Sequence, residues 1–307
     1  MYIVHYTLII MDNVYHIPAM LQETIEGLAI KPQGVYVDVT FGGGGHSRAM
    51  MECLQDGGHL FSFDQDADAL QNAIDDPKWT FVHSNFRYLR NWMDYYGVEQ
   101  IDGLLADLGV SFHHFDCPER GFSFRFSAPL DMRMNQTAKR TAADIVNGYS
   151  EEELAKIFFL YGELKNGRGI AKNICKARSQ KPIERTEDLV AASRIPAEMS
   201  KELARLFQAL RIEVNDEMGA LREMLVAARD LLKPGGRIAI LTYHSLEDRL
   251  VKNFLRSGNL EGTIEKDFYG NNLSPFTLIE KGREASAEEV ERNPRARSAK
   301  LRVAEKR

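Results

Sequence analysis

The sequence predicts an α/β fold in which a mostly parallel sheet is interrupted by a helical insertion. Three observations support this prediction. The first third of the chain alternates apolar, β-branched runs with helical segments, as repeated strand–helix units do. Four glycines, at 42–45, directly follow the first apolar run. The alternation stops after Gly109 and resumes at Gly236, so a long insertion divides one sheet.

The first third is expected to supply four strands of this sheet. Each is short, apolar and rich in β-branched or aromatic residues, and together they cover 34–41, 59–66, 79–86 and 101–109. The segments between them have helical character and cover 46–56, 67–74 and 88–96. Such alternation implies parallel strands with helices on both faces.

An irregular stretch from Ser111 to Met134 follows the fourth strand. The region after it is helical, and its first long helix begins with the capping-box residues Ser150 and Glu153. The expected helices cover 150–162, 167–180, 186–194 and a long segment from about Lys201 to Leu232. The sheet is then completed by a strand at 233–245, a helix at 246–256 and a C-terminal strand at 297–306.

The composition is that of a globular protein of a reducing compartment. With 307 residues and 44% hydrophobic content, the chain is long enough for a large core. Its three cysteines form no CxxC pair, so we expect neither a metal site nor a disulfide framework. The apolar segment 1–10 lacks a basic region and a cleavage site. We expect it to be an N-terminal extension, or else a short edge strand, of a cytoplasmic protein with no membrane partner.

The net charge of −5 conceals two basic islands. Residues 165–185 contain seven basic residues and one acid, and residues 292–307 contain the same numbers. Each island therefore carries +6, which leaves −17 on the rest of the chain. Basic islands on an acidic body suggest a polyanionic partner that binds at a defined place, and the alternative is two solvated faces.

The stretch DVTFGGGGH, 38–46, predicts a loop that binds a nucleotide-like cofactor. It does not fit the dinucleotide fingerprint G-x-G-x-x-G, because Ser47 takes the sixth position counted from Gly42. An acid, three residues and G-x-G, here from Asp38 to Gly44, is instead the usual spacing in S-adenosylmethionine (SAM)-dependent methyltransferases. The glycines would let the backbone approach the methionine part of SAM, and the carboxylate would meet its α-ammonium.

Three further residues lie at the expected strand ends. Asp64, 22 residues after Gly42, is placed to accept hydrogen bonds from both ribose hydroxyls. Phe86 ends the third strand and would cover the adenine, or else pack in the core. Asp107 ends the fourth strand, at the sheet edge where ligands bind in such folds. Together with Asp38, these acids predict a SAM-binding fold.

Seven motifs occur in order from about His16 to Val303: TFGGGGHSR, DLGVS, ERGFSFRF, PLDMRM, FQALRIEVNDE, YHSLEDRLVK and NPRARSAKLR. Together they closely resemble the MraW (RsmH) family of bacterial methyltransferases. The resemblance implies a class I SAM-dependent methyltransferase with a Rossmann-like, seven-stranded, mostly parallel sheet and an inserted helical domain. It implies methylation of the exocyclic N4 of a cytidine in the decoding region of 16S ribosomal RNA (rRNA), within the small ribosomal subunit or its precursor. The expected domains are a SAM-binding domain at 11–111 and 214–307 and a substrate-recognition domain at 112–213.

The same resemblance implies which residues contact SAM. These are Gly44, Gly45, His46, Asp64, Phe86 and Asp107, in addition to Asp38 and Gly42 from the loop spacing. One further family contact is often a glutamine, and His114 stands at that position here. A histidine can donate one hydrogen bond but does not reproduce the donor–acceptor pair of an amide. Tyr243 stands where phenylalanine is common in the family.

The chemistry of N4 defines the expected catalytic residues. Because its lone pair is delocalised into the ring, N4 must be held in line with the methyl group, at about 3–3.5 Å. An acceptor for an N4–H bond is also needed, and Asp107 or Ser111 is best placed by sequence. His113, His114 and His244 are further candidates for accepting the proton, unless they are structural or the proton leaves to water. The expected catalytic set is Asp107, Ser111 and His114.

Several basic residues are expected to contact RNA. Arg133 of PLDMRM, or its neighbour Asp131, would meet the base or a phosphate, and Arg125 and the phenylalanines of GFSFRF would stack on bases, unless the phenylalanines form core. The two islands add Lys172, Lys176, Arg295 and Arg297. Two other functions stay open, a methyltransferase acting on DNA or protein and a non-catalytic RNA-binding assembly factor. The sequence does not decide between a monomer and a dimer.

Overall fold

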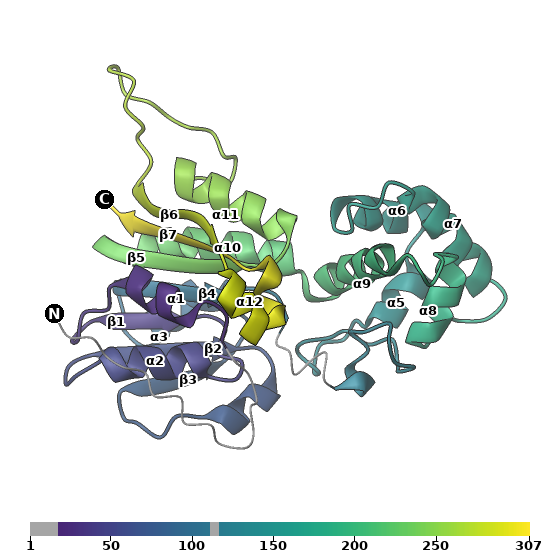
Figure 1. The fold of residues 1–307 in the computed structure, drawn as a ribbon, viewed down its shortest axis with the longest axis horizontal. Helices are drawn as coiled ribbons and strands as arrows, with labels where there is room; N and C mark the ends of the chain where they lie inside the picture. The colour runs from purple at the N-terminus through teal and green to yellow at the C-terminus, as the bar shows by residue number, and fades with distance from the viewer. Residues whose placement is uncertain (1–17, 111–116) are drawn as a thin grey trace.

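The computed structural model describes residues 18–110 and 117–307, which form a seven-stranded sheet beside a group of helices (Figure 1). The strands are β1 (Val35–Asp38), β2 (His59–Asp64), β3 (Trp79–His83), β4 (Ile101–Asp107), β5 (Leu232–Thr242), β6 (Phe276–Glu284) and β7 (Lys300–Lys306). Their order is β3-β2-β1-β4-β5-β7-β6; β1 to β5 pair in parallel, and β7 is antiparallel to both of its neighbours. The class I SAM-dependent methyltransferase fold expected from the sequence is confirmed.

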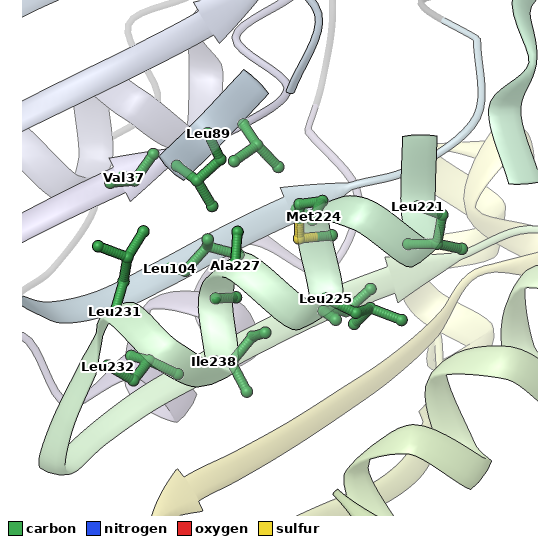
Figure 2. Close-up of a cluster of buried hydrophobic side chains, with 14 of the residues drawn as sticks. Val37, Leu89, Leu104, Leu221, Met224, Leu225, Ala227, Leu231, Leu232 and Ile238 are labelled. Atoms are coloured by element: carbon green, nitrogen blue, oxygen red, sulfur yellow. The ribbon is translucent and has the colours of Figure 1, made fainter. Parts of the chain in front are cut away.

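Helices cover both faces of the sheet. They are α1 (Leu21–Leu28), α2 (Gly45–Cys53), α3 (Leu89–Tyr95), α10 (Glu217–Leu231), α11 (Ser245–Ser257) and α12 (Ala287–Arg292). Figure 2 shows Met224 and Leu225 of α10 in the cluster that contains Leu104 of β4 and Ile238 of β5. The next residue of β4, Leu105, belongs to the cluster on the opposite face, with residues of α1 and α2. This alternation is the period-two pattern of a strand buried on both faces.

The inserted helices form a hydrophobic core of their own. They are α5 (Ala142–Gly148), α6 (Glu151–Leu160), α7 (Gly167–Arg178), α8 (Thr186–Ser193) and α9 (Ser200–Asn215). This core extends from Phe122 to Leu210 and contains no buried residue of the described sheet strands. Figure 1 shows these helices set to one side of the sheet. The domain limits 112 and 213 themselves stay a prediction.

The expected long helix from Lys201 to Leu232 is wrong, because the chain breaks at Asp216. Asp216 has a left-handed backbone (φ 46°), so α9 ends and α10 begins there. Aspartate is among the few residues that tolerate this conformation. Its carboxylate accepts a hydrogen bond of 2.7 Å from Arg87, which fixes the corner between the insertion and the sheet domain.

Three other expectations for the elements also need correction. The segment 67–74 contains a 3₁₀ helix, η1 (Ala67–Asn72), instead of an α-helix. The third strand ends at His83, and Phe86 begins the short helix η2 (Phe86–Tyr88). The edge strand β6 had no counterpart among the strands located by sequence. These differences are local, and the strand order is unaffected by them.

Candidate active site

A cavity of about 330 Å³ lies at the carboxyl ends of the parallel strands. The sheet domain lines it with the glycine loop and with residues at or just after the ends of β2, β3, β4 and β5, among them Asp64, Phe86, Asp107 and Tyr243. The insertion contributes Met134, Gln208 and Arg211, and the C-terminal region contributes Arg295 and Ser298. The volume is in the range of small-molecule sites. The two parts of the chain therefore share one cavity.

The glycine loop has a backbone that other residues would strain. Gly42 and Gly44 have φ of +51° and +75°, in the left-handed region that L-residues rarely adopt. A Cβ on Gly44 would overlap the Arg48 guanidinium and lie 3.0 Å from the Phe41 ring. Gly42, Gly43 and Gly45 line the cavity and present backbone to it, whereas Gly44 is not among the lining residues, and contact of the loop with SAM stays a prediction.

Asp38 lies behind this loop. Its buried carboxylate accepts hydrogen bonds from the Thr40 amide (3.0 Å) and the Ser47 hydroxyl (2.6 Å), and Asp38 is not among the residues that line the cavity. Burial raises the pKa of this carboxyl group. Its observed contacts connect β1 to α2 and support the loop from behind. The expected contact between Asp38 and the α-ammonium of SAM stays a prediction, and this geometry does not favour it.

Asp64, the last residue of β2, is hydrogen-bonded to the glycine loop and lines the cavity. Its Oδ2 accepts the Gly42 amide at 2.8 Å, and its Oδ1 accepts the Asp66 amide at 2.9 Å. The half-buried ring of Phe86 lines the cavity as well. A carboxylate that accepts hydrogen bonds, loop backbone and an aromatic ring are suitable partners for the adenosine part of SAM. Gly44 and His46 flank this set at the start of α2, where His46 also lines the cavity.

Asp107 is held by two hydrogen bonds and faces a histidine. Its amide donates to the Thr40 hydroxyl (2.7 Å), and the Tyr243 hydroxyl donates to its Oδ1 (2.7 Å). Its Oδ2 lies 3.6 Å from Nδ1 of His46. Burial, with a smaller contribution from the Glu247 charge, raises the pKa of Asp107 to about 7, although the Tyr243 hydrogen bond lowers it. This carboxyl group therefore exchanges a proton near neutral pH.

The tautomer of His46 follows from its other contact. Its Nε2 lies 3.1 Å from the carbonyl oxygen of Ala19, which can only accept, so Nε2 carries the hydrogen. Burial lowers the pKa of His46, which favours the neutral ring. Nδ1 then presents a lone pair to Asp107. Nδ1 of His46 and Oδ2 of Asp107 are then two neighbouring acceptors. They can share a proton, or both can accept from a donor that enters the cavity.

A network of ion pairs lies at the side of the cavity that faces the insertion. Its contacts were not expected from the sequence. Arg211 donates to both oxygens of Glu217, at 2.7 and 2.8 Å. His244 caps α11 by accepting the Glu247 amide at Nδ1 (3.4 Å), and its Nε2 lies 3.1 Å from a Glu247 oxygen outside hydrogen-bond geometry. Glu217, His244 and Glu247 are close enough to share a cation. Because Arg211 occupies Glu217, the arrangement favours ion pairing.

The residues expected to contact RNA are distributed unevenly. Arg133 pairs with Asp131 at 2.7 Å and donates to the Ala138 carbonyl, so this arginine braces its own loop. Arg125 and Phe126 are exposed. Phe122 is buried and Phe124 packs on Phe207, with ring centroids 5.7 Å apart, so these two phenylalanines are core. Arg295 lines the cavity, and Arg297 is exposed.

The first basic island divides into two groups. Arg178 donates to the Val146 carbonyl, Lys181 pairs with Asp188, and Arg185 bonds Ser127. The other group, Lys165, Arg168, Lys172 and Lys176, is exposed on or beside α7. Among the described residues, none of these four forms an ion pair, so their charge is available to a partner. The proposed roles of Ser111, His113 and His114 concern positions outside the described residues and stay predictions.

The chain matches the model of the MraW methylase family over residues 13–307. The chain belongs to this family. It is 60% identical to "Ribosomal RNA small subunit methyltransferase H" of Parabacteroides distasonis over 300 residues, 96% of this chain and 98% of that protein. The protein of the same name from Bacteroides thetaiotaomicron is 57% identical over 296 residues, 95% and 97% of the two chains. The family expected from the seven motifs is confirmed, and with it a SAM-dependent methyltransferase.

The chain also resembles solved structures of much lower identity. An rRNA methylase from Streptococcus thermophilus is similar with a TM-score of 0.43 and 13% identity, over 95% of this chain and 98% of that chain. In the part of the chain that the structure describes, no helix combines the length and the apolar character needed to cross a bilayer.

Proposed function

We propose that this MraW methylase transfers the methyl group of SAM to the exocyclic N4 of a cytidine in the decoding region of 16S rRNA. The substrate is the small ribosomal subunit or its precursor, in the cytoplasm. The observation that carries the proposal is the position of Asp107. Its carboxyl group lies in a cavity shared by the glycine loop and the insertion, and it exchanges a proton near neutral pH.

The residues present fit SAM. The Asp64 carboxylate would accept from the ribose hydroxyls, Phe86 would cover the adenine, and the backbone of Gly42 to Gly45 would lie against the methionine part. When bound, SAM supplies a methyl group activated by a sulfonium. Asp64 already holds the Gly42 amide, so the ribose acceptor and the loop are positioned together before binding.

Asp107 would act on the target base. A carboxylate that accepts an N4–H bond draws electron density toward nitrogen and helps it become tetrahedral. A pKa near 7 suits a group that must receive a proton at neutral pH and release it again. Asp107 needs no nucleophilic cysteine beside it, since methylation at N4 does not require covalent attack on the ring.

The insertion would bring the RNA to this cavity. A base inside folded RNA must be splayed out before N4 can reach a buried carboxylate, at a cost of a few kcal/mol. The exposed cations of α7, Lys172 and Lys176 among them, suit phosphate contacts that offset this cost without reading sequence. Arg295 adds a positive charge at the cavity itself.

The deciding experiment incubates the protein and isotope-labelled SAM with purified 30S particles, 50S particles, double-stranded DNA or ribosomal proteins stripped of RNA. We expect label in 30S particles alone and N4-methylcytidine in their digested RNA. Label in DNA or protein would favour the first alternative function. SAM binding and 30S binding without any label transfer would favour the assembly factor.

A further inference from the structure

We propose, on the basis of the proposed function, that Tyr243 is a positioning residue for methyl transfer. Its hydroxyl holds Oδ1 of Asp107, so that Oδ2 is the oxygen that receives the N4 proton. The tyrosine directly follows β5 in sequence, and Asp107 is the last residue of the neighbouring strand β4. Both line the cavity.

The geometry separates the two oxygens of Asp107. Oδ1 accepts the Tyr243 hydroxyl at 2.7 Å, a short bond of the charge-assisted kind. Oδ2 accepts no hydrogen bond from the residues of 18–110 and 117–307, and its near neighbour is the Nδ1 lone pair of His46, at 3.6 Å. An amino group that approaches this pair from the cavity would meet two acceptors. The arrangement therefore selects Oδ2 for the amine.

Tyr243 remains a donor throughout the working pH range. Burial and the nearby Asp107 carboxylate both raise the pKa of its phenol far above the ordinary value. Its ring lies beside Gly109, where an added Cβ would be 3.4 Å from the ring atom Cδ2, in ordinary van der Waals contact. A phenol that keeps its proton and donates it at 2.7 Å is a suitable anchor for one carboxylate oxygen.

Four titratable groups face Asp107 from the elements packed around it. They are His46 on α2, Asp38 at the end of β1, Tyr243 after β5 and Glu247 on α11. Asp38 and Glu247 are acids, so their charge disfavours a second carboxylate. The Tyr243 hydroxyl stabilises the ionised form of Asp107 and thus opposes them.

Methyl transfer forms one bond, breaks another and releases one proton from N4. The N4 lone pair forms a bond to the methyl carbon while the carbon–sulfur bond breaks, and its electron pair stays on sulfur to give S-adenosylhomocysteine. The N4 proton passes to Oδ2 of Asp107, which must be ionised at that moment. Without the Tyr243 hydroxyl, a smaller fraction of Asp107 is ionised at neutral pH, and neither oxygen is held.

The test is Tyr243→Phe, which keeps the ring and removes the hydroxyl. The rate of methylation of 30S particles at saturating substrates is measured from pH 5.5 to 9. We expect the acidic side of the pH profile of kcat to move up by about one pH unit in the variant. Its kcat should therefore fall roughly tenfold at pH 6.5 and recover most of this loss at pH 9. The matched control is Tyr149→Phe, which removes a hydroxyl that donates to Glu213 at 2.6 Å inside the insertion.

A second readout does not need activity. Carboxyl ¹³C NMR of the aspartates, assigned with Asp107→Asn, gives the pKa of Asp107 in the wild-type and Tyr243→Phe proteins, and we expect it to rise in the variant. An unchanged pKa, or a loss of kcat that is equal at every pH, would overturn the role of Tyr243. A wild-type protein that leaves 30S particles unmethylated would instead refute the proposed function, and the NMR titration would still decide the carboxylate contact.

Discussion

Arg120 binds Asp66 across the boundary between the insertion and the sheet domain, with Nη1 3.0 Å from Oδ2 of the carboxylate. The same guanidinium donates through Nη2 to the carbonyl oxygens of Arg133 (2.9 Å) and Met134 (3.0 Å). It is 8% exposed. A single side chain thus joins the segment after β2 to the loop that carries the PLDMRM motif.

Both groups that the Arg120 side chain joins lead to the cavity. The amide of Asp66 donates to Oδ1 of Asp64, the expected ribose acceptor, and Met134 lines the cavity. The backbone oxygen of Arg120 also accepts the amide of Met132 at 3.0 Å, and Met132 has a left-handed φ of 62°. Arg120 therefore supports a loop with a strained backbone and, through Asp66, the position of Asp64.

We expect Arg120→Lys to weaken SAM binding and to lower stability by about 1–3 kcal/mol, because lysine keeps the charge but loses the fork of donors. Calorimetric SAM titration and chemical denaturation would measure the two effects. The control is Arg90→Lys, whose exposed pair with Asp94 contributes little. Equal behaviour of the two variants would show that Arg120 does not connect the loop to the cofactor site.

Asp64→Ala should weaken SAM binding about 10- to 150-fold, since two ribose hydroxyls lose a charged acceptor valued at about 1.5–3 kcal/mol. The loss of its bond to the Gly42 amide adds to this effect. Titration calorimetry is the measurement, with the exposed Asp56→Ala as control. Unchanged affinity in Asp64→Ala would refute the ribose assignment.

The sequence predicted the parts of the site that follow from strand periodicity. Asp64 and Asp107 each end a buried apolar run, and the carboxyl ends of parallel strands meet at one edge, so their proximity was predictable. The pairing of Tyr243 with Asp107 and of Arg211 with Glu217 was not. The first contact depends on the register of β4 and β5, which places Asp107 opposite Leu241, and the second depends on the break between α9 and α10, and no local sequence pattern encodes either.

Two errors in the expected elements have different causes. β6 is an edge strand whose exposed positions include Lys281, Arg283 and Glu284 and whose sequence contains Gly282, so it lacks the continuous apolar run of the inner strands. At the break, Asp216 has a left-handed backbone and accepts a hydrogen bond from Arg87, which is far away in sequence. In the sequence, apolar residues continue at helical spacing on both sides of it, and one long helix was the natural prediction.

Asp107 should make stability depend on pH in a defined direction. Its folded pKa of about 7 lies above the ordinary value of 3.8, so the folded state loses stability as pH rises from about 4 to about 7. A shift of this size corresponds to about 4 kcal/mol at most. Asp107→Asn should therefore be more stable than the wild type at pH 8, and the gain should vanish near pH 4.

Denaturant unfolding of the SAM-free proteins at both pH values would measure this gain, with Asp56→Asn as the exposed control. The asparagine oxygen can still accept from Tyr243, and its amide can donate to Nδ1 of His46, so the substitution fits the site. A gain of the same size at pH 4 and pH 8 would mean that the Asp107 carboxyl does not titrate in this range.

The last prediction concerns Lys172 and Lys176, which lie four residues apart on α7 and are both exposed. Residues at this spacing share one helix face, and no described acid neutralises this pair. If the face binds the RNA backbone, Lys172→Glu/Lys176→Glu should weaken 30S binding. The slope of log affinity against log salt should also flatten by about 0.7–0.9 for each phosphate that the variant no longer binds. Filter binding across a salt series would measure both.

SAM affinity should not change in this double variant, because α7 belongs to the insertion core and contributes no residue to the cavity, as far as the described residues line it. A charge-matched control is Lys252→Glu/Lys266→Glu, which changes two exposed lysines outside the insertion by the same total charge. A specific phosphate-binding face predicts that only the α7 variant changes the salt slope. Identical salt slopes in both variants would mean that α7 acts through net charge alone. If the α7 variant methylates 30S particles at the wild-type rate at low and at high salt, this face is merely solvated.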